Sequence, residues 1–333
     1  MKRLDNLYDQ VISIDNLLLA DTIARRGKSR QDGIIKFDKN HDQEIANIYI
    51  ELATNTYKTS PYTTRTIYET KERVISILPY RDRVVQHAIM NILEPMFVAT
   101  FTADTYSCIK GKGIHAASRS LQDALKDKEA TMYCLKLDIK KFYPSIDHDI
   151  LKSLLRKKIK DKELLGLLDE IIDSAPGLPI GNYLSQYFAN FYLAYFDHWI
   201  KEQKAVKHYW RYADDIVILA SNKEYLHRVL AGINKYMDQR LNLQVKSNYQ
   251  IFPVASRGID FVGYVHYHTH KLMRKSIKQN FARRVAKGIN KLSLASYLGW
   301  AKHCNSRHLI KKLRPNEPNH KHRTRKTGSK VLQ

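Results

Sequence analysis

The chain has 333 residues, enough for two or three subdomains around a shared core. It carries 56 Lys and Arg residues against 33 Asp and Glu residues, a net charge of +23. This excess favours a polyanionic partner, above all nucleic acid, because neutralised phosphates release their counterions. No apolar run approaches membrane-spanning length and no signal peptide opens the chain, so we expect no membrane partner. The cysteines Cys108, Cys134 and Cys304 form neither a CxxC pair nor an even framework, so we expect reduced thiols in a cytoplasmic protein.

The N-terminal half predicts a mixture of helices and strands. Apolar residues at helical spacing predict one helix over about 4–25, followed by a basic break. Strand-like segments then read TRTIYET and RVISILP, and a helix is predicted over about 82–97. Residues 131–138, TMYCLKLD, predict a strand that runs into a turn and then a capped helix.

The C-terminal half repeats this alternation. A long helix is predicted over about 183–202, strands on both sides of Asp214, and a further helix near 223–240. Strand segments continue through GIDFVGYVHY, and a last helix starts near 276. It should turn four apolar residues inward: Ile277, Phe281, Val285 and Ile289. The basic stretch from 311 lacks apolar periodicity, so we expect disorder there until an anionic partner binds.

Two adjacent carboxylates stand inside an otherwise apolar segment. Residues 211–220, RYADDIVILA, predict strand, tight turn and strand, with Asp214 and Asp215 at the bend. Neighbouring carboxylates repel, and in an apolar setting one of them protonates unless a cation lies between them. Mg²⁺ prefers such oxygen ligands. On these residues alone, a merely polar turn remains the alternative.

A third carboxylate, Asp138, ends the apolar segment YCLKLD, where burial alone stabilises nothing. If the two strands are neighbours, Asp138 and Asp214 converge on one point. Two-metal phosphoryl transfer requires this arrangement, in which two Mg²⁺ ions serve the attacking and the leaving oxygen. Asp147 and Asp149 instead open a helix, where capping and the helix dipole explain them, so neither is assigned to the site.

Four motifs occur in the order found in reverse transcriptases: DIKKFYPSID, PIGNYLSQ, YADD and GIDFVGY. The chain resembles that family from about Thr66 to about Leu309. The resemblance implies an α+β right-hand polymerase fold and RNA-templated DNA synthesis from deoxynucleoside triphosphates. Its implied divisions are an N-terminal helix (1–28), fingers (29–94 and 147–180), palm (95–146 and 181–271), thumb (272–310) and a basic, disordered tail (311–333).

The resemblance also implies roles for single residues. Asp138 and Asp214 would bind both Mg²⁺ ions, with Asp215 and the Ile139 carbonyl completing the cluster. Tyr143 would lie under the incoming sugar and exclude a 2′-hydroxyl, although an aromatic ring simply packed in the palm is the alternative. The nucleotide site would be completed by Tyr212, Ile180 and Gly181.

Basic residues would hold the phosphates of the substrates. The triphosphate would bind Lys71 and Arg73, and Arg81 and Arg83 would serve the triphosphate or the template. Any one of these cations could instead be only solubilising. The hairpin at Gly263 would support the primer end, and the helix that follows would lie along the template RNA–cDNA hybrid through Lys275, Arg284 and Lys287.

The motif PIGNYLSQ separates subfamilies. Most reverse transcriptases have Gln where Ile180 stands and Pro where Gln186 stands, and this variant resembles the enzymes of diversity-generating retroelements, as does SYLGWAKHCNS. Ile180 lacks the amide that a Gln would offer near the nascent pair, so the geometric check should be looser. The resemblance implies adenine-directed errors in the cDNA and a small basic accessory protein as partner.

Two departures and two alternatives stay open. Ile109 stands where the family usually has Arg, and Lys246 follows a shortened segment in which the family tends to have a general-acid Lys. The alternatives are another bacterial reverse transcriptase, of the retron or group II intron-like kind, and a non-catalytic RNA-binding scaffold. The three intact carboxylates disfavour the scaffold, because a protein without turnover gains nothing from their mutual repulsion.

Overall fold

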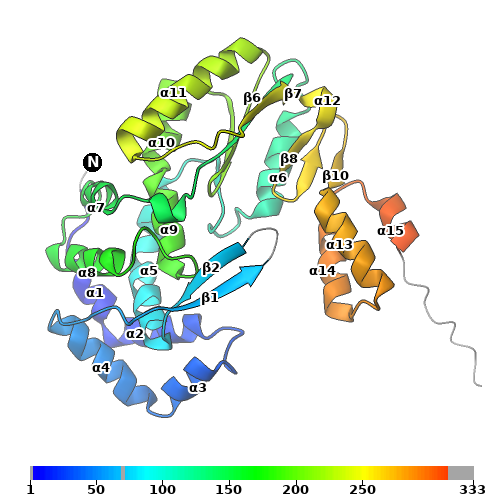
Figure 1. The fold of residues 1–333 in the computed structure, drawn as a ribbon. Helices are drawn as coiled ribbons and strands as arrows, with labels where there is room; N and C mark the ends of the chain where they lie inside the picture. The colour runs from blue at the N-terminus through cyan, green and yellow to red at the C-terminus, as the bar shows by residue number, and fades with distance from the viewer. Residues whose placement is uncertain (1–2, 69–71, 314–333) are drawn as a thin grey trace, which may run out of the picture.

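The computed structural model describes residues 3–68 and 72–313. Figure 1 shows three regions: the helices of the N-terminal part, a central sheet with its helices, and a separate helical unit near the C-terminal end, residues 275–313. None of the helices in these two ranges is long and apolar enough to cross a membrane.

The N-terminal region contains more helices than the apolar spacing predicts. The single helix expected over 4–25 is two, α1 (Tyr8–Ile12) and α2 (Ile14–Ala24). Ser13 separates them because its backbone is extended and its hydroxyl accepts the Asn16 N–H, which caps α2. Helices α3 (Asp32–Asp38) and α4 (His41–Ala53) follow.

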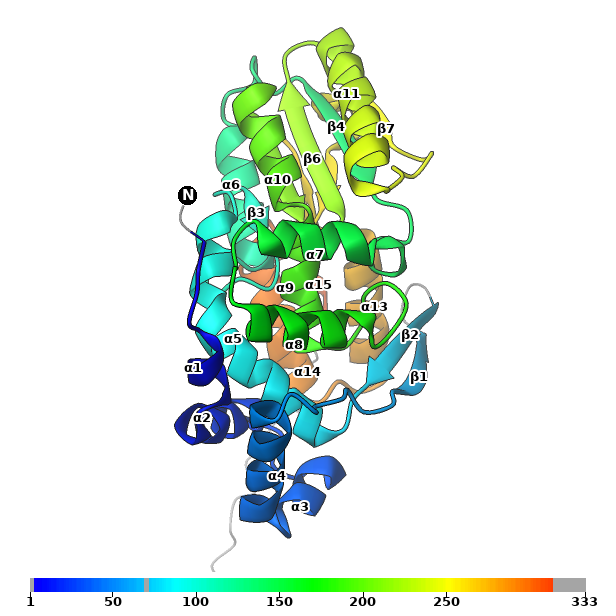
Figure 2. The same cartoon turned by 90° about the vertical axis from the view of Figure 1, so that its left-hand side faces the viewer.

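A two-stranded hairpin and a long helix come next, as predicted. Strands β1 (Thr63–Tyr68) and β2 (Glu72–Ile77) pair antiparallel, and α5 runs from Tyr80 to Thr100. Lys71 lies outside the described residues. The hairpin projects from the N-terminal helices beside the end of α5 (Figures 1 and 2).

The central sheet has the strand order β3-β5-β6-β4-β7. Its strands are β3 (Thr105–Tyr106), β4 (Tyr133–Asp138), β5 (His208–Tyr212), β6 (Asp215–Ala220) and β7 (Gln250–Pro253). Alternating residues serve two cores. Leu135, Leu137, Ile216 and Ile218 belong to the larger core, whereas Cys134, Val217 and Leu219 pack with α6 (Ile114–Ala124).

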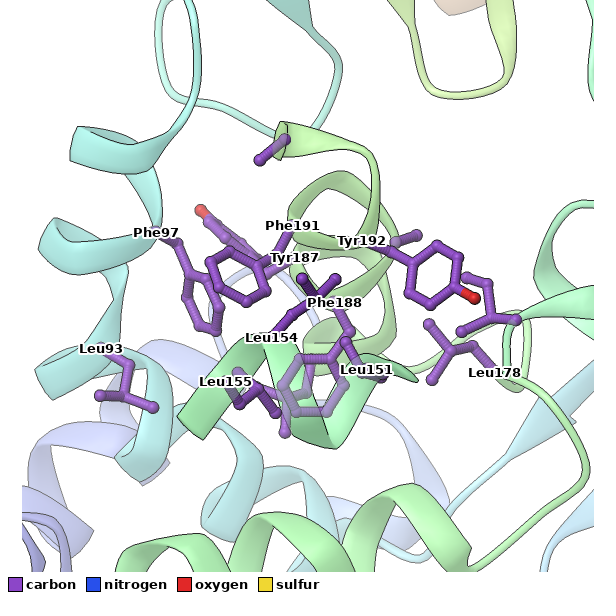
Figure 3. Close-up of a cluster of buried hydrophobic side chains, with 14 of the residues drawn as sticks. Leu93, Phe97, Leu151, Leu154, Leu155, Leu178, Tyr187, Phe188, Phe191 and Tyr192 are labelled. Carbon is purple, nitrogen blue, oxygen red and sulfur yellow. The ribbon is translucent and has the colours of Figure 1, made fainter. Parts of the chain in front are cut away.

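The larger core includes side chains of α5, α7 (His148–Arg156), α8 (Lys162–Asp173) and α9 (Tyr183–Tyr192). Figure 3 shows its aromatic and leucine side chains: Leu93, Phe97, Leu151, Leu154, Leu155, Leu178, Tyr187, Phe188, Phe191 and Tyr192. The predicted continuous helix over 183–202 is wrong in detail. It breaks at Leu193 into α9, α10 (Ala194–His198) and a π-helical turn, Trp199–Gln203.

Helix α11 (Lys223–Leu241) matches its prediction and ends at Asn242, which adopts the left-handed conformation. A short helix α12 (Val254–Arg257) leads into a second sheet, β8 (Ile259–Phe261), β9 (Tyr264–His266) and β10 (Lys271–Met273), paired in the order β10-β9-β8.

The predicted last helix is three helices, α13 (Lys275–Ala286), α14 (Lys291–Ala301) and α15 (Arg307–Leu313). The break after α13 contains Gly288 with φ +82°. Of the four residues expected to point inward only Phe281 is fully buried, because this helical unit has little core of its own. The disordered tail predicted from 311 is wrong for 311–313, which are helical; the remainder lies outside the described residues.

Candidate active site

The sheet brings the three predicted carboxylates to one edge. Asp138 ends β4 and pairs in register with Asp215, the first residue of β6. Asp214 occupies the turn between β5 and β6, directly after Ala213, whose φ is +52°. The hypothesis that the two strands are neighbours is therefore confirmed, and the convergence follows from antiparallel pairing.

Each end of this carboxylate cluster touches a lysine. The Lys246 ammonium lies 2.6 Å from Asp138 Oδ1, and the Lys246 N–H donates to the Asp138 carbonyl at 2.9 Å. Lys136 Nζ approaches Asp215 Oδ2 at 3.7 Å and donates to the carbonyl of Asp260 in β8. Lys246 is thus placed at the cluster despite the shortened segment before it.

Burial and mutual repulsion weaken the acidity of the cluster. Burial raises the pKa of Asp214 to about 6, and the charge of Asp138 adds to the rise. Burial also raises the pKa of Asp215 to about 6, although Lys136 opposes the shift. Two carboxyl groups that resist ionisation side by side are stabilised as anions when a divalent cation joins them.

A divalent cation fits these residues chemically. Asp215 Oδ1 is buried and has no hydrogen-bond partner among the described residues, so one hard oxygen donor of the cluster is unused. In residues 3–68 and 72–313, no three acidic, imidazole or thiol groups already enclose a metal position, and Lys246 occupies Asp138 Oδ1. A bound cation and Lys246 therefore compete for that oxygen atom.

The neighbours of Asp214 include the predicted nucleotide-site aromatics. Burial raises the pKa of Tyr143, and the nearby Cys108 and Asp214 raise it further. Burial also raises the pKa of Tyr212, the residue that pairs with Asp215 across the turn. Ile139 is fully buried and bridges to Val245, which fixes the backbone beside Asp138.

The loop before α9 packs directly against the β1–β2 hairpin. The Ser76 N–H in β2 donates to the Ile180 carbonyl at 2.8 Å. Gly181 has φ +120°, and a Cβ atom there would lie 2.6 Å from the Ser76 carbonyl oxygen. Gly181 is therefore required by this contact between hairpin and loop, while Ile180 keeps its side chain half-exposed.

A cavity of about 400 Å³ lies beneath this contact, where α2, β2, α5 and α9 meet. Its lining includes Arg26, Lys28 and Arg83 and, among the described residues, no carboxylate. Gln86, 2% exposed, leaves its Nε2 without a partner among the described residues. His87 stacks on Tyr183, and burial lowers its pKa to about 4. Of the lining residues named in this paragraph, the sequence predicted only Arg83 as a site residue.

The other fingers cations behave differently from one another. Arg73 is exposed on β2. Arg81 is bonded to Glu51 at 2.5 Å, so its guanidinium is already engaged within the protein. Arg83 instead lines the cavity described above. Lys110, the residue after the buried Ile109, is exposed.

Gly263 lies at the turn between β8 and β9 with φ +86°. A Cβ atom there would come within 2.3 Å of the Trp300 ring in α14, so this glycine admits a thumb side chain. Lys275 is exposed at the start of α13, and Arg284 and Lys287 line a cavity of about 510 Å³ between α13 and α14. That cavity has no acidic residue in its lining.

Asp147 caps a helix as expected, whereas a buried polar network near the active site was not predicted from the sequence. Asp147 caps α7 by accepting the Ile150 N–H at 3.1 Å, as predicted. The missed residues are Arg211, Asp197 and Asn190, which form a buried polar network behind the YADD turn. Its sequence signal is a charged residue two positions from Tyr209, on the inward face of an apolar strand.

Three carboxylates at the strand ends of the central sheet, with the β1–β2 hairpin on one side and a basic helical unit on the other, define a right-hand nucleic acid polymerase. The profile of the family described as "Reverse transcriptase (RNA-dependent DNA polymerase)" matches residues 58–266. The chain therefore belongs to the reverse transcriptase family and carries an RNA-directed DNA polymerase domain.

Individual relatives agree with this family. The chain is similar to Protein YkfC of Escherichia coli, at 23% identity, over 73% of this chain and 74% of the relative. It is 25% identical to the group II intron-encoded protein LtrA of Lactococcus lactis over 49% of this chain, but spans only 29% of LtrA. The apo telomerase of Candida tropicalis shares the fold, with a TM-score of 0.51 at 14% identity, over 72% of this chain and 54% of the telomerase chain.

Proposed function

We propose that this protein extends a DNA primer along an RNA template, using deoxynucleoside triphosphates and two Mg²⁺ ions. The observation that carries the proposal is the register of β4 with β6, which places Asp138 and Asp215 opposite one another and Asp214 beside them. When bound between these carboxylates, Mg²⁺ would lower the pKa of the primer hydroxyl and neutralise charge on the leaving pyrophosphate.

The residues of the chain supply position and charge for this reaction. Asp138, Asp214 and Asp215, with the Ile139 carbonyl, hold the metal ions. Tyr143 and Tyr212 form the floor of the nucleotide site. Lys246, whose ammonium lies at Asp138 Oδ1, would give a proton to the departing pyrophosphate.

The nucleic acids follow the basic surfaces. We assign the single-stranded template to the cavity lined by Arg26, Lys28 and Arg83, because its lining combines these cations with the stacked pair His87 and Tyr183. Lys71 and Arg73 meet the triphosphate. Lys275, Arg284 and Lys287 lie along the hybrid duplex, and Gly263 supports the primer through its contact with Trp300. The predicted fingers, palm and thumb boundaries are part of this proposal.

At the finer level we propose error-prone copying of a template RNA for a diversity-generating retroelement. Ile180 supports it, because its half-exposed aliphatic side chain offers no hydrogen bond to the nascent pair. A small basic accessory protein belongs to the same proposal. The similarity to LtrA favours a second candidate, a group II intron-like reverse transcriptase that copies accurately.

The test is primer extension on an RNA template with Mg²⁺, followed by sequencing of the cDNA. Wild-type synthesis that disappears in Asp214→Asn supports the polymerase. Errors concentrated opposite template adenines and reduced in Ile180→Gln support the retroelement assignment, whereas accurate products unchanged by Ile180→Gln favour the second candidate. Absence of synthesis, with partner protein and RNA added, favours the non-catalytic scaffold.

A further inference from the structure

A buried ion pair lies directly behind the turn that carries Asp214. The side chains of Arg211 in β5 and Asp197 in α10 are both 0% exposed. Arg211 Nε lies 2.8 Å and 3.0 Å from the two carboxylate oxygens of Asp197. Asp197 also accepts hydrogen bonds from the hydroxyls of Tyr209 at 2.6 Å and Thr105 at 2.9 Å.

Stability alone gives a weak reason for this arrangement. Desolvating two charges costs several kcal/mol, and well-packed apolar residues often serve a core equally well. The guanidinium, however, presents several donors in a fixed plane, so it can hold more than one acceptor at set angles. The remaining donors of Arg211 indicate what it holds.

Arg211 Nη1 donates to the Ala213 carbonyl at 3.1 Å. Ala213 stands in the left-handed conformation, φ +52°, which is unfavourable for a residue other than glycine. Its carbonyl belongs to the peptide unit that leads into Asp214. By fixing that peptide plane, Arg211 fixes the position of the Asp214 backbone, which carries the carboxylate side chain.

The same guanidinium reaches a second turn through Asn190 in α9. Arg211 Nη1 donates to Asn190 Oδ1 at 3.0 Å, and Asn190 Nδ2 donates to the Ser107 carbonyl at 2.9 Å. Ser107 and Cys108 have φ values of +86° and +56°, so this turn also holds two residues outside their preferred conformation. Strands β3 and β5 are parallel neighbours, so both turns leave the sheet at one edge.

We propose that Arg211 and Asn190 are positioning residues, which hold the Ala213–Asp214 turn and the Ser107–Cys108 turn in one fixed arrangement and so set the geometry of the metal-binding carboxylates. The inference rests on the proposed function, since it assigns Asp214 to a divalent cation. Neither residue touches the metal or the nucleotide; each acts through a backbone carbonyl.

The experiment compares Arg211→Lys and Asn190→Ala with Thr105→Val. The first two lose hydrogen bonds that reach the two turns, whereas Thr105→Val loses the hydroxyl's hydrogen bonds to Asp197 and Thr102. All three should lower the melting temperature. Mn²⁺ binding is followed by electron paramagnetic resonance, and single-turnover primer extension is measured over a range of Mg²⁺ concentrations, well below the melting temperature.

We expect Mn²⁺ affinity and the maximal extension rate each to fall about 10- to 100-fold in Arg211→Lys and Asn190→Ala, with the half-saturating nucleotide concentration changed less than about 3-fold. Thr105→Val should keep the metal affinity and rate of the wild type. Parallel losses in all three variants, or unchanged metal affinity in the first two, would show that the network is only structural and overturn the proposal.

The metal-binding measurement also separates this inference from the proposed function. If the wild type binds Mn²⁺ but extends no primer, the polymerase assignment fails while the affinity order of the variants still decides the positioning role. If Asp214→Asn binds Mn²⁺ as tightly as the wild type, both assignments of the turn fail.

Discussion

The palm turn and the outer basic surfaces use the same residue type in opposite ways. Arg211 is fully buried, and its guanidinium meets Asp197, Asn190 and a backbone carbonyl. Arg83 and Arg284 line open cavities and form no ion pair with any carboxylate of residues 3–68 and 72–313. A buried arginine fixes the geometry of a backbone; an unpaired one at a cavity is available to a phosphate.

This difference separates the two demands on a polymerase. Metal-dependent chemistry needs carboxylates held within fractions of an ångström, and the sheet with its buried ion pair provides that rigidity. Movement along a template needs contacts that form and break with many sequences, and exposed cations provide them through charge. Substitutions in the two regions should therefore fail differently.

The largest effect is expected at the carboxylates. Asp138→Asn and Asp214→Asn should each lower the rate of primer extension about 1,000-fold or more, since metal-assisted charge stabilisation contributes several kcal/mol to the barrier. The control is Asp147→Asn, where an amide still caps α7. Rates from rapid-quench extension should leave the control near wild type, and equal losses at Asp147 and Asp214 would remove the distinction between cap and site.

The next effect tests the contact between the β8–β9 turn and the thumb. Gly263→Ala forces a side chain against Trp300 at a positive φ. We therefore expect the free energy of unfolding to fall by about 2 kcal/mol and the hybrid duplex to dissociate faster. Gly299→Ala in α14 is the matched control, because a Cβ atom there meets nothing within 4 Å. Thermal unfolding and duplex dissociation of the two variants should differ; matching values would show that the Trp300 contact is dispensable.

Electrostatic contacts should produce a smaller loss that depends on salt. Arg83→Gln and Lys28→Gln should each weaken binding of a single-stranded RNA template several-fold and reduce the slope of log affinity against log salt by about 0.7. Arg81→Gln should leave that slope unchanged, because Glu51 already holds Arg81. Fluorescence anisotropy at several salt concentrations measures the slopes, and a reduced slope for Arg81 would return that residue to the template site.

The sequence predicts the carboxylate site better than the surfaces around it. Asp138 and Asp214 are recognisable because polar residues interrupt apolar strands, and antiparallel pairing then leaves little freedom in where they meet. The role of Arg211 depends on its contacts with Asp197 and Asn190, which belong to two helices. A local sequence pattern cannot predict contacts between such separate segments.

Cations on the surface show the same limit. Arg81 and Arg83 are two positions apart in one helix, yet one meets Glu51 of α4 and the other lines a cavity. Their difference comes from packing between distant segments. The break of the predicted 183–202 helix at Leu193 and the division of the thumb into three helices also depend on tertiary packing, which overrides helical periodicity.

The smallest effect concerns the free energy of unfolding that is lost when the carboxylates lie together without a metal ion. The pKa of Asp214 is about 6 in the folded protein and lies near its ordinary value of 3.8 when unfolded. Between these values the folded state binds more protons, so its free energy of unfolding should decrease as the pH rises from 4 to 7. Asp214→Asn cannot ionise and should escape this share of the decrease, which leaves it about 1 to 2 kcal/mol more stable than wild type at pH 7 in EDTA, after allowance for solvent screening.

Denaturant unfolding at pH 4.5 and pH 7, with EDTA or with Mg²⁺, measures this difference. The advantage of Asp214→Asn should be small at pH 4.5, larger at pH 7, and reduced or reversed by Mg²⁺, because a bound cation stabilises only the wild-type cluster. An advantage that is independent of pH would mean that Asp214 is ordinary in acidity. The strain in the YADD turn would then come from the left-handed backbone of Ala213, whose carbonyl Arg211 holds in place, and electrostatic repulsion would make no contribution.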